Sequence, residues 1–205
     1  MRLPCLFQFR ILKEAVKALV SGPYTSKYPF GPHEPAERFR GKPKYNDDYC
    51  IGCTACAEVC PAKAIDVEDS VEDGTRTMVY HADICIFCGQ CEANCPTEKG
   101  IQLSHDFDLA CFERNACDES VTKTLVVCEG CGETIGTQEQ IVWLAKKLGT
   151  LAYSNPTLFL SYLQNVKLVG EIEKPAPQDE VTRADRFNIL CPKCRREVVI
   201  RDGKL

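Results

Sequence analysis

The 205-residue sequence lacks several features that would assign it to a common class of protein. It contains no run of about eighteen apolar residues, the length that a helix needs to cross a bilayer. Charged and polar residues interrupt its first twenty-two positions, so these do not form the uninterrupted apolar core of a secretory signal peptide. The sequence therefore predicts a cytoplasmic protein without a signal peptide or a transmembrane helix, in a compartment where thiols stay reduced.

Motifs for nucleotide binding and for catalysis are also missing. Neither G-x-G-x-x-G nor G-x-x-x-x-G-K-[ST] occurs, and no Ser/His/Asp set or carboxylate pair stands out. The three histidines, His33, His81 and His105, are isolated in the sequence and are interpreted as surface or packing residues. The net charge of −4 argues against a general nucleic-acid binder. We therefore expect no catalytic residues in this chain and no nucleic-acid partner.

Cysteine, in contrast, is present in excess, at fifteen residues. CIGCTACAEVCP begins at Cys50 and CIFCGQCEANCP begins at Cys85, and both have the spacing C-x2-C-x2-C-x3-C-P. A disulfide scaffold would require a secretory context, which the N-terminus does not support. Zinc sites use paired knuckles and would leave these triplets of cysteines unexplained. The two runs therefore predict iron–sulfur clusters.

The spacing also predicts which cysteines share a cluster. Three cysteines at intervals of three wrap a short loop around a cubane, and in chains with two such runs the remote cysteine of each run binds the other cluster. One [4Fe–4S] cluster is thus expected on Cys50, Cys53, Cys56 and Cys95, and a second on Cys85, Cys88, Cys91 and Cys60.

A duplicated unit of strand, loop, short helix and strand is the simplest account of the surrounding residues. The apolar-alternating segments TMVYH, AIDVE and IQLSH supply its strands. One irregularity is expected, because Ile65 lies five residues after Cys60 whereas Ile101 lies six residues after Cys95. The second turn should therefore bulge near residues 98–100.

A second metal site is predicted beyond these runs. VCEGCGETIG and LCPKCRRE are two C-x2-C knuckles whose four thiolates, Cys128, Cys131, Cys191 and Cys194, would suit zinc or a single iron. The segments LVV and FNIL ahead of the knuckles look like strands, and TQEQIVWLAKKL between them looks like a helix. Two unrelated pairs of free thiols remain the alternative. Cys5, Cys111 and Cys117 are expected to be free buried cysteines.

The N-terminal segment predicts an amphipathic helix that ends at Gly22-Pro23, followed by an extended arm rich in proline and glycine. Basic residues lie around an apolar stripe made of Leu6, Phe9, Leu12, Val16, Leu19 and Val20. A lone helix of this length is marginal in water, so something must cover the stripe. The candidates are a membrane surface, a membrane-embedded partner subunit and the chain's own core.

Together these patterns predict an α+β fold with three parts. Residues 1–45 would form the helix and docking arm, residues 46–118 a two-cluster ferredoxin domain, and residues 119–205 a metal-ribbon domain built on four cysteines.

ERFRGKPKYN, CIFCGQCEANCPT and SHDFDLACFER resemble the ferredoxin-like subunit of respiratory complex I and of its hydrogenase relatives. The paired cysteines of the tail make the chain similar to formate hydrogenlyase subunit 6 and hydrogenase-4 component H. The resemblance implies a non-catalytic electron relay, peripheral on the cytoplasmic side of the membrane. Its implied partners are an electron-donor subunit or ferredoxin, a membrane subunit, and the small subunit that carries a terminal [4Fe–4S] cluster.

Three other functions agree less well with the sequence. A complex I subunit feeding quinone reduction is disfavoured by the cysteine pairs of the tail. A freely diffusing ferredoxin would not need residues 1–45 or 119–205. A metal-stabilised interaction module with structural clusters is disfavoured because a relay needs two adjacent clusters and a staple does not.

Overall fold

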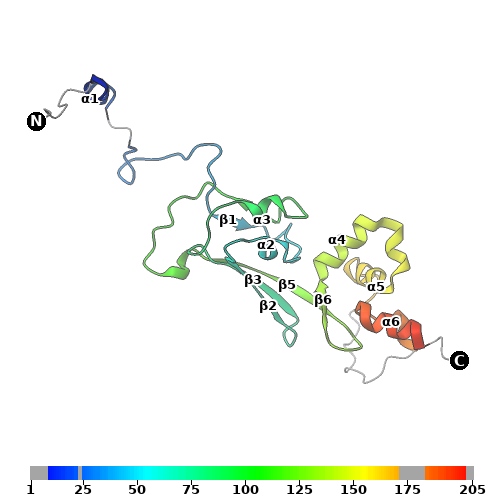
Figure 1. The fold of residues 1–205 in the computed structure, drawn as a ribbon. Coiled ribbons are helices and arrows are strands. Elements are labelled where there is room, and N and C mark those ends of the chain that lie inside the picture. The colour runs from blue at the N-terminus through cyan, green and yellow to red at the C-terminus, as the bar shows by residue number, and fades with distance from the viewer. Residues whose placement is uncertain (1–8, 23–24, 171–182, 202–205) are drawn as a thin grey trace, which may run out of the picture. The chain divides into compact units, whose positions relative to one another are not determined.

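The computed structural model describes residues 9–22, 25–170 and 183–201 (Figure 1). The chain separates into two units, Met1–Phe39 and Arg40–Leu205. The predicted division of the second unit at residue 118 stays a prediction. None of the helices among the described residues has the length and apolarity needed to cross a membrane.

The described part of the first unit includes helix α1 (Phe9–Ser21), and the predicted amphipathic pattern is visible in it. Its described side chains are exposed, including Phe9 at 89% and Leu19 at 86%. Gly22 closes the helix with a positive φ of 73° and donates its backbone N–H to the Ala18 carbonyl, 3.0 Å away. Leu6, the first residue of the predicted stripe, lies outside the described residues.

The second unit begins with the predicted duplication. Its first half is β1 (Pro43–Tyr45), α2 (Ala55–Glu58) and β2 (Ile65–Ser70), and its second half is β3 (Thr75–Tyr80), α3 (Gln90–Ala93) and β4 (Ile101–Leu103). β1 pairs antiparallel with β4, and β2 pairs antiparallel with β3. Each half thus contributes one strand to each pair, which interlocks the two halves and lets their cysteine runs face each other.

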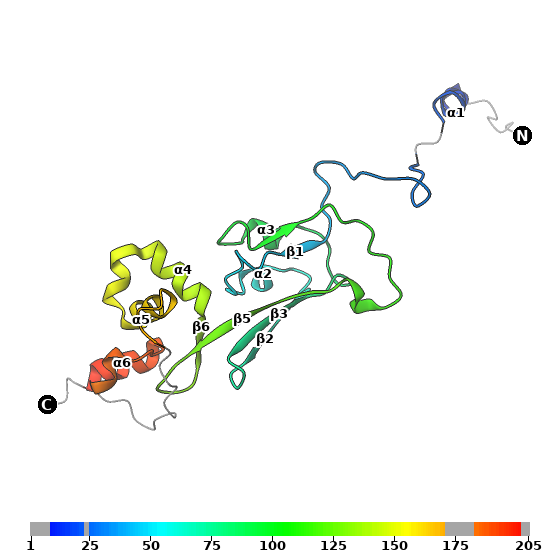
Figure 2. The same cartoon turned by 180° about the vertical axis from the view of Figure 1, so that it is seen from behind.

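The C-terminal region is joined to this core by one long strand. After the short 3-10 helix η1 (Arg114–Cys117), β5 (Glu119–Val127) pairs antiparallel with β3, and β6 (Thr134–Thr137) pairs antiparallel with β5. The sheet order is therefore β2-β3-β5-β6, with α2 and α3 lying next to each other beside β1 (Figures 1 and 2).

Five helices follow β6 among the described residues of the second unit. They are α4 (Gln138–Leu148), η2 (Gly149–Ser154), α5 (Pro156–Asn165), η3 (Arg183–Phe187) and α6 (Pro192–Arg201). The helix predicted from TQEQIVWLAKKL is confirmed as α4, which Thr137 caps by accepting a hydrogen bond from the Gln140 N–H. The prediction of a strand in FNIL is wrong. This segment runs from the end of η3 to the start of α6. The second cysteine knuckle therefore lies at the start of a helix and not at the end of a strand.

Candidate iron–sulfur and metal sites

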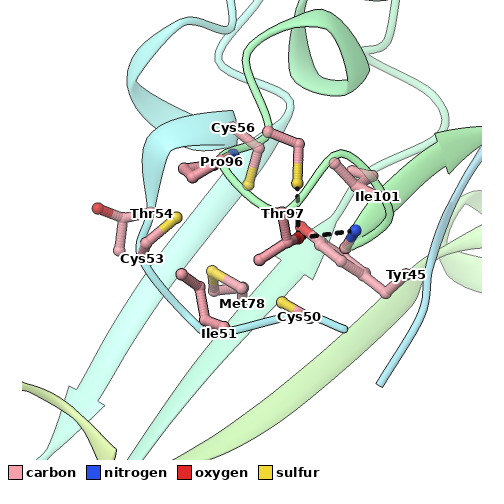
Figure 3. Close-up of a pocket in the computed structure, with 12 residues that line it drawn as sticks. Tyr45, Cys50, Ile51, Cys53, Thr54, Cys56, Met78, Pro96, Thr97 and Ile101 are labelled. Atoms are coloured by element: carbon pink, nitrogen blue, oxygen red, sulfur yellow. Dashed lines mark hydrogen bonds between the residues drawn. The ribbon is translucent and has the colours of Figure 1, made fainter. Parts of the chain in front are cut away.

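The thiols of the two cysteine runs gather around two separate cavities. Empty space of about 290 Å³ is bordered by Cys50, Cys53, Cys56 and Cys95. In Figure 3 the thiols of Cys50, Cys53 and Cys56 point into this first cavity, with Tyr45 and Met78 on its border. The second cavity, with about 360 Å³ of empty space, is bordered by Cys60, Cys85, Cys88 and Cys91. Each cavity therefore receives three cysteines from one run and the fourth from the other.

Left-handed backbone conformations curl each loop around its cavity. The first loop has positive φ at Gly52 (63°) and Thr54 (64°), and the second has it at the matching positions Phe87 (53°) and Gly89 (77°). A non-glycine residue with positive φ is uncommon, and for a bulky residue such as phenylalanine it is an outlier. Such turns direct successive backbone N–H groups to one side and create a concave site for an anion. The loops are thus shaped for a group whose surface accepts hydrogen bonds.

The turns after the fourth cysteine of each run begin alike and then differ. Lys63 and Glu98 both have positive φ, and their N–H groups donate to the carbonyls of Cys60 and Cys95 at 3.3 and 3.0 Å. The extra residue of the second turn therefore lies after Glu98. A Cβ at Gly100 would lie 2.9 Å from the Thr97 hydroxyl oxygen and 3.2 Å from the Cys95 sulfur, so only glycine fits there.

Two tyrosines border the cavities at equivalent positions of the repeat. Tyr45 borders the first cavity and Tyr80 the second. Their phenol oxygens are buried and have no hydrogen-bond partner of normal geometry among the described residues, and the neighbouring thiols are those of Cys56 and Cys85. Leaving a buried donor unsatisfied costs about 1–3 kcal/mol. Sulfur acceptors inside the cavities would remove that cost, so the phenols fit an iron–sulfur cluster.

Burial and hydrogen bonding shift the pKa values of these thiols in opposite directions. Burial, reinforced by the thiols of Cys50 and Cys53, raises the pKa of Cys56 to about 12, and burial raises the pKa of Cys91 to about 11. Burial also acts on Cys95, but hydrogen bonds from Thr97, Gly100 and Ile101 outweigh it and lower the pKa. Thiolates so close together need a positive core between them.

His81, interpreted from the sequence as a surface or packing residue, lies between two carboxylates, with Nδ1 2.8 Å from Asp118 and Nε2 3.2 Å from Asp66. Hydrogen bonding to Asp118 raises the pKa of His81. Asp118 also accepts the Ala82 N–H at 3.1 Å, which ties the start of the second loop to the residues just before β5.

The cysteines of the two knuckles come together in the fold, and we call their cluster the tetrathiol site. The sulfur atoms of Cys128, Cys131, Cys191 and Cys194 all lie within 4.8 Å of one another, and those of Cys131 and Cys191 are 3.8 Å apart. A tetrahedral site with Zn–S bonds of about 2.3 Å separates its sulfurs by about 3.8 Å. Burial raises the pKa of Cys128, but the backbone amides of Cys191, Cys131 and Gly130 outweigh it and hold that pKa at about 7. The geometry fits a structural metal.

The remaining cysteines differ from expectation in one respect. Cys111 is exposed and Cys117 is half-buried, so the expectation that both are buried is wrong. Their sulfurs are 3.8 Å apart, which places the two thiols in contact. Cys5 lies outside the described residues.

Sequence reasoning missed the two tyrosines, although they lie at the same thirty-five-residue spacing as the cysteines. It also missed Thr137, whose hydroxyl donates to the Ile51 carbonyl in the first loop. Nothing near Thr137 in the sequence indicates this contact.

Comparisons with known proteins bear on these sites. Residues 49–99 match the family described as a 4Fe-4S dicluster domain. The chain is 37% identical to formate hydrogenlyase subunit 6 of Escherichia coli (strain K12) over 133 residues, which is 65% of this chain and 72% of the relative. It is 39% identical to NAD(P)H-quinone oxidoreductase subunit I of Nostoc sp. over 54 residues, 26% of this chain and 28% of the relative.

Among solved structures, the chain is similar to one from the membrane-bound sulfane sulfur reductase, described as an archaeal respiratory membrane complex. That similarity has a TM-score of 0.40 and 28% identity, over 56% of this chain and 60% of the other.

Proposed function

This chain belongs to the family of formate hydrogenlyase subunit 6 and is an iron–sulfur electron-transfer subunit, and on that premise we propose that it relays single electrons through two [4Fe–4S] clusters within a membrane-bound hydrogenase complex. The observation that carries the proposal is the partition of eight thiols between two cavities, three from one run and one from the other in each. A [4Fe–4S] cluster, when bound, accepts and returns one electron.

The proposed ligands are Cys50, Cys53, Cys56 and Cys95 for the first cluster and Cys85, Cys88, Cys91 and Cys60 for the second. The residues around these cysteines would position the clusters and adjust their reduction potentials, and they take no part in a reaction themselves. Inward backbone amides, the Thr97 hydroxyl on Cys95 and the phenols of Tyr45 and Tyr80 offer hydrogen bonds to sulfur, which stabilise the more negative, reduced state. Met78 and Ile101, at 1% and 2% exposure, limit the access of water.

A structural metal at Cys128, Cys131, Cys191 and Cys194 completes the proposal, with zinc favoured over iron. Three of the four thiols are buried, and the site joins the turn after β5 to the start of α6. Closing this long loop would stabilise the helices between the knuckles without contributing redox chemistry.

The exposed apolar face of α1 supports a peripheral position on the cytoplasmic side of a membrane, against a membrane subunit of the complex. The other proposed partners are an electron-donor subunit or ferredoxin and the small subunit that carries a terminal [4Fe–4S] cluster. Deleting residues 2–21 should release the chain from the membrane fraction while leaving both clusters intact. A truncated chain that still sediments with membranes and retains its partners would reject this role for α1.

Metal analysis of the anaerobically purified protein tests the cluster proposal. We expect about eight cluster irons and about one zinc per chain, with spin coupling between the reduced clusters. Cys60→Ser should damage the cluster held by the second loop and spare that of its own run. About four irons per chain, or damage confined to the first loop in Cys60→Ser, would contradict the crossed ligand sets.

A further inference from the structure

Two cations face each other across strands β3 and β5. Arg76 and Lys123 are direct partners in the antiparallel register. Like charges directly opposite one another destabilise a sheet. Both side chains are nevertheless largely buried, at 12% exposure for Arg76 and 7% for Lys123. A buried pair of like charges requires negative charge close by.

Each cation has one carboxylate partner, but the two partners differ in their exposure. Lys123 Nζ donates to the Asp47 carbonyl at 2.7 Å and lies 2.8 Å from the Asp47 carboxylate, whose side chain is 79% exposed. Arg76 forms a two-pronged pair with Asp69 at 2.6 and 2.7 Å. Because Asp47 is so exposed, solvent screens its charge and it compensates Lys123 weakly.

Both cations also contact the loop that borders the first cavity. Arg76 Nη1 donates to the Gly52 carbonyl at 3.0 Å. The Lys123 stem packs on the same residue, since a Cβ at Gly52 would lie 3.2 Å from Lys123 Cγ. Gly52 lies between Cys50 and Cys53, so Arg76 Nη1 and the Lys123 stem both contact the loop at its centre.

A different set of charged side chains surrounds the second loop. The cation that donates to it, Arg40, bonds the Cys88 carbonyl at 3.1 Å from an exposed position, where solvent screens the charge. Nearby lie the carboxylates of Asp66 and Asp118 with His81 between them, and Asp83, which pairs with Arg114 at 2.8 Å.

We propose that Lys123, which lies opposite Arg76, raises the reduction potential of the first cluster above that of the second. The inference rests on the proposed function, because it needs a cluster in each cavity. A cluster with four thiolates is an anion that becomes more negative on reduction. A buried cation therefore stabilises its reduced state more than its oxidised state. A single electron entering the subunit would then rest on the first cluster.

The proposed effect depends on a residue outside the dicluster domain. Lys123 lies in β5, beyond the dicluster match at residues 49–99. The C-terminal region thus brings a charge close to the first cavity, which a minimal ferredoxin domain would not contain.

Redox titration of the anaerobic holoprotein, followed by electron paramagnetic resonance, tests the inference. Lys123→Met should lower the higher of the two midpoint potentials and leave the lower one unchanged. The ratio of reduced to oxidised first cluster at a fixed potential should fall by about tenfold, which is 59 mV for a one-electron couple. Lys123→Arg should behave like the unmodified protein, because it keeps the charge.

Two further variants keep the test decisive. Lys123→Gln loses the charge but retains an N–H donor for the Asp47 carbonyl, so it should reproduce the shift even if the methionine variant assembles poorly. Lys44→Met removes an exposed cation that pairs with Asp106 at 2.5 Å and should shift neither potential. Unchanged potentials in Lys123→Gln, or equal shifts of both, would overturn the inference. Unmodified protein with fewer than two clusters would instead overturn the proposed function.

Discussion

Replacing Thr137 with valine tests how firmly the C-terminal region holds the first cluster loop. Thr137 is fully buried, at 0% exposure. Its hydroxyl donates to the Ile51 carbonyl and accepts the Gln140 N–H at 3.3 Å, so one oxygen joins the loop to the start of α4. Valine has almost the same shape and offers neither hydrogen bond. The substitution thus removes the junction while leaving the packing in place.

The expected loss follows from those two bonds. Losing an N-cap hydroxyl costs about 1 kcal/mol, and depriving a buried carbonyl of its donor costs about 1–2 kcal/mol more. The free energy of unfolding should therefore fall by about 2–3 kcal/mol. For a chain of this size each kcal/mol lowers the melting temperature by about 2–4 °C, which gives a decrease of about 4–12 °C.

Thermal scans of the anaerobic holoprotein, followed by the visible absorption of the clusters, measure this decrease. All variants need the same scan rate, because cluster loss makes unfolding irreversible. Thr137→Ser keeps the hydroxyl and loses only a methyl group, so it should melt closer to the unmodified protein. If Thr137→Val has the same melting temperature as the unmodified protein, the Thr137 hydroxyl does not join the loop to α4. The same conclusion follows if Thr137→Ser lowers the melting temperature as much as Thr137→Val does.

Three other predictions concern a glycine, a histidine and the tetrathiol site. Gly52→Ala should destabilise the holoprotein by about 2–4 kcal/mol, because φ is +63° and the new Cβ would meet Thr137 Cγ2 at 2.7 Å. Gly132→Ala, with similar φ and open space, should lose less in the same thermal scans, and an equal loss would contradict the steric reason. His81 has a raised folded-state pKa, so its ion pairs should stabilise the fold below the ordinary pKa of histidine and lose that effect as pH rises through the raised value. Denaturation at several pH values should show this dependence, and Asp118→Asn should flatten it. A steep dependence that persists in that variant would assign it to other groups. A strong chelator, or Cys194→Ser, should remove the metal of the tetrathiol site and make residues 128–201 sensitive to protease while the visible spectrum of the clusters persists. Unchanged protease resistance after metal loss would show that the site does not hold the region together.

Local patterns in the sequence were sufficient for the cysteine groups and for the two helices α1 and α4. The spacing of three between cysteines limits which thiols one loop can present to a cubane, and the duplication supplies the fourth. The cavities group these thiols as the spacing predicted, although ligation itself stays a proposal. The helices α1 and α4 follow from apolar periodicity and from their end signals, which are properties of adjacent residues.

Short apolar runs were insufficient, as FNIL illustrates. A run of four apolar or small polar residues does not distinguish a strand from a buried turn. In the structure the Leu190 N–H donates to the Thr157 hydroxyl, and the Ile189 N–H donates to the Glu129 carboxylate. These backbone groups are satisfied by side chains rather than by a neighbouring strand, and no local signal marks such partners.

Only the tertiary structure could place Lys123 opposite Arg76, Thr137 over Ile51, and His81 beside Asp118. Each contact depends on the pairing of β5 with β3, which joins residues that are far apart in the sequence. Strand registers of this kind are selected by the summed packing of a whole sheet face, because a shift of one residue would turn every side chain to the other side. Short spacings in the sequence are therefore enough to identify the cysteines that could hold the clusters. The charged side chains and the Thr137 hydroxyl approach these cysteines only when the sheet has formed.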